Sequence, residues 1–237
     1  MSPSREEPSR LFLAGATGAV GSLFLPLAEA AGHAVVPHVR PQSAAKTPLA
    51  AHPNACVANL GDTPRIADAM RGCDAAVCLV GTMRNRFAAG DSYEASDIGA
   101  VREVVAACQA AGVPRVVLLS SLGAGGMGAY LKAKGEAERI VRESGLAWAI
   151  ARPGAFASPE GAPEGLHGAR RFPGFGKALF AGLGAVGLEG FAHRYGPMPL
   201  DVLAAALLRA AEGRADGCIL HGEDLQRLAG AGEVTRR

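Results

Sequence analysis

The sequence has no large excess of either charge and no long uninterrupted apolar run. Its 24 basic and 22 acidic residues leave a net charge of +2, dispersed along 237 residues. A chain without a basic face is not expected to bind nucleic acid or anionic lipid. Glycine, proline or charge breaks every apolar stretch before it reaches the roughly 18 to 20 residues that cross a bilayer. We therefore expect neither a nucleic-acid partner nor a membrane anchor.

Paired cysteines and an N-terminal targeting segment are also lacking. The five cysteines are an odd number set among small apolar residues, which is typical of reduced, packed thiols in a cytoplasmic protein. The closest pair, Cys73 and Cys78, lacks further ligands at zinc-like spacing, so no metal site is expected. The opening "MSPSREEPSR" is polar and has no signal-peptide core. We predict a cytoplasmic protein with a disordered tail at residues 1–9 and a flexible one at 231–237.

What the sequence does contain is a regular alternation of short apolar runs and longer stretches of helical period. Its hydrophobic content of 49% is enough to bury a substantial core. The alternation predicts a single α/β domain over residues 10–230, a doubly wound, Rossmann-type parallel sheet with helices on both faces. The predicted strands are 10–14, 34–39, 55–58, 75–80, 115–120, 147–151 and 218–221.

Helices are expected between these strands, and one long segment breaks the pattern. The predicted helices are about 19–31, 63–71, 92–111, 128–143 and 200–212, with a last turn near 224–228. The stretch from about 155 to 198 is rich in glycine and proline and has no clear period. It is predicted to leave the sheet as an excursion that supplies a substrate wall.

A glycine-rich loop, "GATGAVG", follows the first predicted strand. Gly15 permits a tight turn, Gly18 allows a pyrophosphate to approach the backbone, and Gly21 allows the next helix to pack closely on the strand. The positive end of that helix favours phosphate groups. A purely structural turn can also show this glycine spacing, but the strands that follow favour a dinucleotide-binding loop.

The second strand ends without the acidic residue that would bind the ribose 2'-hydroxyl of NAD. Arg40 stands there in "VPHVRP", and a guanidinium suits a 2'-phosphate. This favours NADP(H) as the cofactor, with NAD(H) as the alternative. A solvated arginine at a strand end remains the other interpretation of Arg40.

Two serines at the end of a predicted strand precede Tyr130 and Lys134. Four residues separate this tyrosine and lysine, which places them on one face of a helix. An ammonium group beside a phenol stabilises the phenolate, so that the tyrosine can pass a proton to or from a substrate oxygen. Ser121, with Ser120 as the reserve choice, could hold that oxygen. A solvated helix face and a strand-end cap are the structural alternatives.

These motifs resemble the short-chain dehydrogenase/reductase superfamily, in its atypical NAD(P)H-binding branch, and most closely its Tat-interacting oxidoreductase-like proteins. The resemblance rests on "GATGAVG", "VCLVGTMR", "LLSS", "YLKAKGEAE" and "RPG", in this order from about residue 11 to 154. It implies Ser121, Tyr130 and Lys134 as catalytic residues. The residues it assigns to the cofactor, from the diphosphate through the adenosine to the nicotinamide, are Gly15, Thr17, Gly18, Ala19, Val20, Arg40, Asn59, Leu60, Gly81, Thr82, Lys134, Pro153 and Gly154.

The sequence departs from the family pattern in two places. Tyr130 follows Ser121 by only nine positions, and the glycines between them predict a flexible connection. Pro41 occupies a place where the resembled proteins often carry a second basic residue.

Two functions of different classes follow. The first is an NADP(H)-dependent oxidoreductase that acts on a small carbonyl or alcohol, as a monomer or homodimer. The alternative is a regulatory or redox-sensing protein that binds NADPH without turnover and reports through a protein partner. Epimerisation of a nucleotide sugar is less favoured, because the chain after Arg152 is short for a sugar-nucleotide domain.

Overall fold

A parallel sheet forms the centre of the protein. The computed structural model describes residues 8–81, 92–154, 156–157 and 198–230. The strands of the main sheet are β1 (Arg10–Ala14), β2 (Ala34–Val39), β3 (Cys56–Val57), β4 (Ala75–Cys78), β5 (Arg115–Leu119), β6 (Ala147–Ala151) and β9 (Cys218–Leu220). Within the described residues these seven strands lie in the order β3-β2-β1-β4-β5-β6-β9, and all neighbours pair in parallel.

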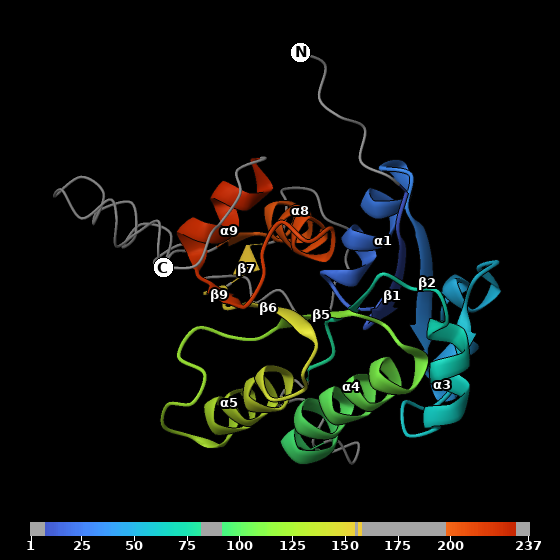
Figure 1. Ribbon diagram of the computed structural model, residues 1–237, viewed down its shortest axis with the longest axis horizontal. Helices are drawn as coiled ribbons and strands as arrows, with labels where there is room; N and C mark the ends of the chain where they lie inside the picture. The colour runs from blue at the N-terminus through green and yellow to red at the C-terminus, as the bar shows by residue number, and fades with distance from the viewer. Residues whose placement is uncertain (1–7, 82–91, 155, 158–197, 231–237) are drawn as a thin grey trace, which may run out of the picture.

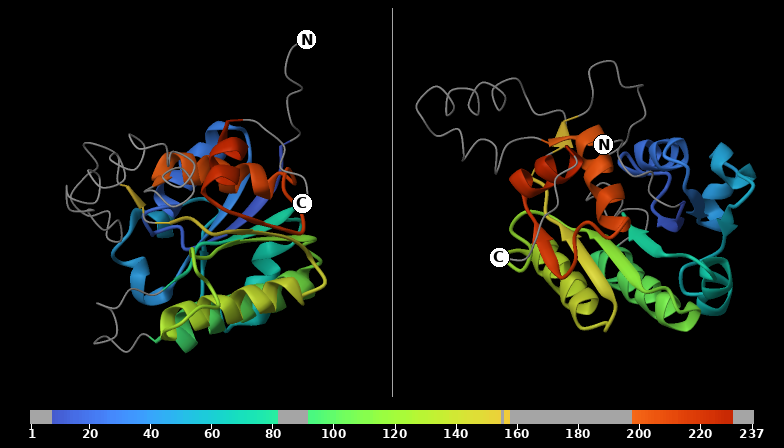
Figure 2. Two further views of the ribbon diagram at one scale, coloured as in Figure 1. Left: turned by 90° about the vertical axis from the view of Figure 1, so that its left-hand side faces the viewer. Right: turned by 45° about the horizontal axis from the view of Figure 1, so that its top comes forward.

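Helices cover both faces of this sheet. They are α1 (Gly21–Ala30), α2 (Pro41–Ala44), η1 (Pro48–Ala51), α3 (Thr63–Met70), η3 (Glu94–Gly99), α4 (Ala100–Ala111), α5 (Ala129–Arg142), α8 (Leu200–Ala211) and α9 (Gly222–Ala229). Figures 1 and 2 show α1, α8 and α9 on one face and α3, α4 and α5 on the other. The result is the three-layer α/β arrangement that the sequence predicts.

The central strand shows why both faces must be covered. Leu11 and Leu13 of β1 belong to the core cluster beneath α1 and α8, whereas Phe12 and Ala14 belong to the cluster beneath α3 and α4. All four side chains are fully buried. Because successive strand residues point to opposite faces, a strand that is apolar throughout can only lie between two layers.

The predicted elements agree with the observed ones along most of the chain. The bounds of β1, β2 and β6 match the prediction, whereas β4, β5 and β9 end one or two residues early and β3 is one residue shorter at each end. Helix α1 begins at Gly21 rather than near residue 19. The short elements α2 and η1 were not predicted. Directly before β1, Ser9, which the prediction assigns to the tail, donates its amide to His33 Nδ1 at 3.1 Å.

The predicted excursion after β6 falls almost entirely outside the described residues. At its two ends, β7 (Phe156–Ala157) and β8 (Met198–Pro199) pair in parallel as a separate two-stranded sheet. The two ends of the predicted excursion therefore lie side by side, and α8 begins directly after β8. In the part of the chain that the structure describes, no helix is both long and apolar enough to cross a membrane.

Candidate cofactor and active site

The glycine-rich loop joins β1 to α1, and its backbone packs closely on itself and on Leu79. Gly15 has φ +90°, and a Cβ atom there would lie 2.9 Å from the carbonyl carbon of Leu79. A Cβ on Gly21 would lie 2.3 Å from the carbonyl oxygen of Gly15. Both positions therefore require glycine, because any side chain would collide with backbone. Helix α1 has no side-chain cap and no acidic residue in its first turn, so its amides and its positive end suit an anion.

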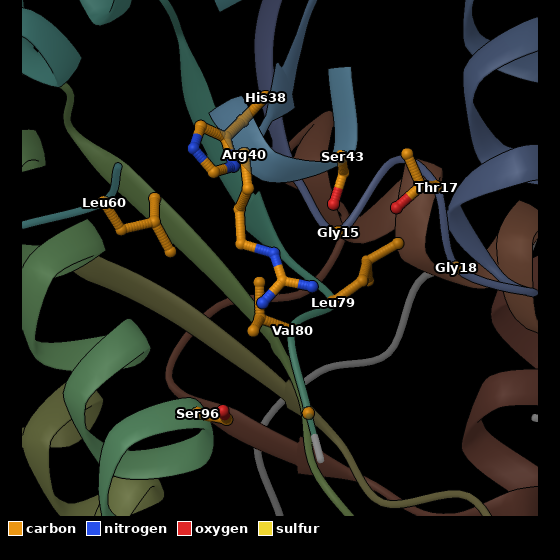
Figure 3. Close-up of a pocket in the computed structure, with 11 residues that line it drawn as sticks. Gly15, Thr17, Gly18, His38, Arg40, Ser43, Leu60, Leu79, Val80 and Ser96 are labelled. Carbon is orange, nitrogen blue, oxygen red and sulfur yellow. The ribbon is translucent and has the colours of Figure 1, made fainter. Parts of the chain in front are cut away.

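A pocket opens above this loop, at the carboxyl ends of the central strands. In Figure 3 the side chain of Arg40 extends into it from the end of β2, and the hydroxyl groups of Ser43 and Thr17 lie to one side. The lining residues are Gly15, Thr17, Gly18, His38, Arg40, Ser43, Leu60, Leu79, Val80, Gly81 and Ser96. A crevice at this edge of a doubly wound sheet is where such folds bind nucleotides.

Six of the residues predicted for the cofactor line this pocket: Gly15, Thr17, Gly18, Arg40, Leu60 and Gly81. Ala19 and Val20 are the last loop residues before α1 and are not part of the lining, and Val20 is buried. Asn59 is exposed next to Leu60 but is not part of the lining. Pro153 and Gly154 follow β6 and are not part of the lining. Thr82 lies outside the described residues.

Five further residues of the pocket were not predicted as site residues: His38, Ser43, Leu79, Val80 and Ser96. His38 is buried, and its Nε2 lies 2.8 Å from the carbonyl oxygen of Ala58. Burial lowers the pKa of the His38 imidazole from 6.5, the Ala58 hydrogen bond opposes this, and the charge of Arg40 adds to it. Ser43 stands three positions after the strand-end Arg40, and this spacing is the signal that could have identified it.

Tyr130 and Lys134 lie on one face of α5, as their spacing predicts. The Lys134 ammonium lies 5.9 Å from the centre of the Tyr130 ring. It also adjoins the pocket, because a Cβ atom on Gly81 would lie 3.0 Å from Lys134 Nζ. Lys134 therefore lies at the rim of the pocket beside Gly81, with Tyr130 next to it, and neither of the two side chains is among the lining residues.

Lys134 has a partner that the sequence did not reveal. Its Nζ lies 2.8 Å from Oδ1 of Asp97, and both side chains are almost fully buried. Burial acts to lower the pKa of the Lys134 ammonium, but the Asp97 carboxylate and the Tyr130 phenol outweigh it, so the pKa is raised. Asp97 belongs to η3, a π-helical turn, a geometry that is frequent at functional sites.

The two serines after β5 have different surroundings. Ser120 is buried and donates its hydroxyl to Glu138 Oε1 at 2.5 Å. Glu138 is itself fully buried and accepts two hydrogen bonds from Arg152, at 2.7 and 2.5 Å. Ser121 is half-buried, and its hydroxyl makes a long contact of 3.4 Å with the carbonyl of Leu122. Of the two hydroxyls, that of Ser121 is the more available to a substrate.

The loop between Ser121 and Tyr130 is held against α5, although its glycines predict a flexible connection. The amide of Gly125 donates to the carbonyl of Leu131 at 2.7 Å, and the amide of Leu122 donates to the carbonyl of Pro153 at 2.9 Å. A Cβ on Gly135 would lie 2.6 Å from the Cα of Gly125. Glycine in the middle of α5 thus lets the loop backbone pass close to the helix.

In the described ranges no cluster of side chains is suited to a metal ion. No group of three or more His, Cys, Asp or Glu residues there could hold a metal ion. All five cysteines are free, and burial raises the pKa of the Cys78 thiol to about 11, which keeps it protonated and unreactive.

The parallel sheet, the glycine-rich loop after β1 and the pocket above it define a Rossmann-type dinucleotide-binding protein. A family model described as NAD(P)H-binding matches residues 15–173, which is more than half of the chain. The protein therefore belongs to this NAD(P)H-binding family.

Three relatives illustrate the breadth of this group. An uncharacterized sugar epimerase from Bacillus subtilis is 29% identical over 161 residues, which span 64% of this chain and 74% of the relative. A short-chain dehydrogenase/reductase superfamily protein from Agrobacterium tumefaciens, solved with bound NAD, matches with a TM-score of 0.65 at 18% identity, over 89% of this chain and 76% of that one.

The third relative is the NADPH-dependent quinone oxidoreductase of Escherichia coli, solved with NADPH. It matches with a TM-score of 0.58 at 18% identity, over 88% of this chain and 67% of that one. At such identities the two structural likenesses show the fold, and the cofactor of this chain has to be argued from its own residues.

Proposed function

We propose that the protein is an NADP(H)-dependent oxidoreductase that interconverts a small carbonyl compound and the corresponding alcohol. The observation that carries this is the Arg40 side chain, which extends into the pocket above the glycine-rich loop. None of the described residues that line the pocket is acidic. A carboxylate would repel a 2'-phosphate, whereas a guanidinium forms charge-assisted hydrogen bonds with it.

The pocket residues fit the cofactor in its other parts as well. The backbone leaves no room for a side chain at Gly15 or Gly21, and the first turn of α1 suits the diphosphate. Leu60 offers an apolar contact for the adenine, and Gly81 leaves a passage toward Lys134. NADPH in the Escherichia coli relative supports the view that this fold accepts the 2'-phosphate.

The residues at the rim would carry the proton chemistry. When bound, the reduced cofactor supplies a hydride to the carbonyl carbon and is left as NADP⁺. Tyr130 donates its hydroxyl proton to the carbonyl oxygen, which completes the alcohol. The ammonium of Lys134, held by Asp97, stabilises the phenolate that remains until solvent returns a proton. Ser121 donates a hydrogen bond to the same substrate oxygen.

Calorimetry with NADPH and NADH tests the proposed contact between Arg40 and the 2'-phosphate of the cofactor. We expect the wild-type protein to bind NADPH more tightly than NADH. Loss of a charged hydrogen-bond partner in Arg40→Ala should weaken NADPH binding about 10- to 100-fold and leave NADH binding nearly unchanged. Arg71→Ala removes a well-exposed guanidinium outside the pocket and is the matched control. Equal affinities for the two nucleotides in the wild type would contradict the NADP(H) assignment.

Turnover assays test the proposed role of Tyr130 as the proton donor. With a carbonyl panel and NADPH, the wild type should oxidise the nucleotide in proportion to the alcohol formed. Tyr130→Phe removes the proton donor and should lower kcat about 10²- to 10⁴-fold, while NADPH affinity stays the same. If kcat is unchanged in this variant, Tyr130 is not the acid.

A second function, NADPH sensing without turnover, is favoured by one observation. The Lys134 charge is already paired with Asp97 in a buried site, so part of its influence on Tyr130 is neutralised. For a sensor we expect tight NADPH binding, no oxidation with any carbonyl, and a protein partner whose capture depends on the nucleotide.

The same assay also tests a third function, epimerisation of a nucleotide sugar, because one relative bears the name of a sugar epimerase. An epimerase would convert one sugar nucleotide into another with no net consumption of NADPH. An oxidoreductase consumes the nucleotide in a one-to-one ratio with product.

A further inference from the structure

Two pairs of residues face each other across η3 and α5. Tyr93, which directly precedes η3, and Asp97 within it are four positions apart, as are Tyr130 and Lys134 on α5. Asp97 contacts Lys134, with 2.8 Å between the charged atoms. Tyr93 contacts Tyr130, with 5.6 Å between the ring centres and 54° between the ring planes. The same turn therefore contacts both the phenol and the ammonium of the candidate catalytic pair.

The two contacts have different physical reasons. A buried ammonium needs a carboxylate, so Asp97 is explained by the charge of Lys134 alone. No such need explains an aromatic ring beside Tyr130, because the Tyr130 side chain is only half-buried. A tilted pair of rings at this distance is attractive and restricts the orientation of both rings.

The chain just before Tyr130 offers little to hold its ring. Four of the eight residues between Ser121 and Tyr130 are glycines, and Met127 is 93% exposed. Lys134 contacts the ring as a cation near its face, at 5.9 Å. Tyr93 supplies the one ring-to-ring contact recorded for Tyr130 among the described residues.

We propose that Tyr93 is a positioning residue, whose ring holds the Tyr130 ring in the orientation from which its hydroxyl reaches the substrate oxygen beside Lys134. The contact between the two rings, and not the Tyr93 hydroxyl, carries this role. The inference rests on the proposed function for its effect on catalysis, but the restriction of the ring can be measured without any substrate.

Nuclear magnetic resonance tests the contact that is proposed to restrict the ring. The chain has three tyrosines, so selective labelling of tyrosine gives three sets of ring signals, and Tyr130→Phe identifies one of them. Tyr93→Leu removes the neighbouring ring and should shift the Tyr130 ring signals. Tyr93→Phe keeps a ring and should leave them close to their wild-type positions. Equal spectra of the Tyr130 ring in the leucine variant and the wild type would overturn the proposal.

Kinetics then separates positioning from folding. Tyr93→Leu should lower kcat about 3- to 10-fold, the size expected for loss of one aromatic contact, with KM for NADPH unchanged. Tyr93→Phe should restore kcat to within about twofold of wild type, and melting curves should show both variants folded. In a Tyr130→Phe background Tyr93→Leu should have almost no further effect, because the residue acts through Tyr130.

The outcomes distinguish this inference from the proposed function. If the ring signals behave as expected and no carbonyl is reduced, the oxidoreductase proposal fails and the restriction of Tyr130 by Tyr93 stands. If carbonyls are reduced and Tyr93→Leu turns over like the wild type, or the two substitutions are additive, the positioning role is wrong and the oxidoreductase proposal stands.

Discussion

At the scale of single residues, the motif that contains Lys134 does not show which residue pairs with its ammonium group. The spacing of Tyr130 and Lys134 predicts a shared helix face, and the structure places both there. The carboxylate of Asp97 is what allows the ammonium to be buried, since an unpaired buried charge costs several kcal/mol. Nothing near Lys134 in the sequence indicates this partner, because it lies on a different helical segment.

His38 gives a pH dependence at the same scale. Burial lowers its pKa from 6.5, so the unfolded chain binds a proton at a higher pH than the folded chain does. Between these two pKa values the unfolded state holds more protons, and the free energy of unfolding falls as the pH decreases. We expect full stability above about pH 6.5 and a loss below it.

Chemical denaturation at a series of pH values measures this loss. A His38→Gln variant has no imidazole to titrate at this position, so its stability should decrease less between pH 7.5 and 5. The same dependence in both proteins would show that other groups cause the acid sensitivity.

At the scale of elements, the close packing of the Ser121–Tyr130 connection on α5 is the clearest difference from expectation. A sequence of glycines predicts flexibility, because glycine has the most conformations to lose. The amide of Gly125 and the carbonyl of Leu131 nevertheless form a 2.7 Å hydrogen bond, which the absence of a side chain at Gly135 permits. Glycine here allows two backbone segments to approach each other closely. The sequence alone does not distinguish this role of glycine from flexibility.

Gly135→Ala tests this packing. Alanine favours a helix by about 0.5–1 kcal/mol, but its Cβ would lie 2.6 Å from the backbone of Gly125, and such overpacking costs about 1–3 kcal/mol. We expect a net loss of stability in denaturant unfolding, together with lower turnover because the loop carries Ser121. Gly61→Ala is the control, since no atom lies within 4 Å of a Cβ there. A Gly135→Ala protein as stable as the wild type would show that the loop moves away at no cost.

The elements that the sequence predicted poorly are short or paired over long distances. The hydrophobic pattern predicts β1, β2 and β6 at their observed bounds, because a mainly apolar run of strand length suffices for a buried strand. A four-residue helix such as α2 carries too few residues for a period. The pairing of β7 with β8 joins segments far apart in the chain, so no local signal marks it.

At the scale of the whole molecule, the site is assembled at the carboxyl edge of the sheet from β1, β2, β4, η3 and α5. The core clusters fix the helices on the sheet, so that Arg40 from the end of β2 lines the pocket and Lys134 from α5 adjoins it at Gly81. A ligand that contacts all of them should stabilise the fold as a unit.

Thermal unfolding with added nucleotide tests this. NADPH at about 100 times its dissociation constant should raise the free energy of unfolding by about 2.7 kcal/mol. For a chain of this size that corresponds to a rise in Tm of about 5–10 °C. NADH at the same concentration should give a smaller rise, and Arg40→Ala should remove most of the difference. An unchanged Tm at saturating NADPH would contradict the cofactor site altogether.

The sequence by itself determined the α/β fold, the glycine-rich loop and the pairing of Tyr130 with Lys134 on one face. Each of these depends on local spacing, namely the period of strands and helices and the steric need for glycine at a turn. Only the tertiary structure decided that Asp97 and Tyr93 face that pair, that Ser120 binds Glu138, and that Ser43 and His38 share the pocket of Arg40. These contacts join elements distant in the chain, and their partners are set by how helices pack on the sheet.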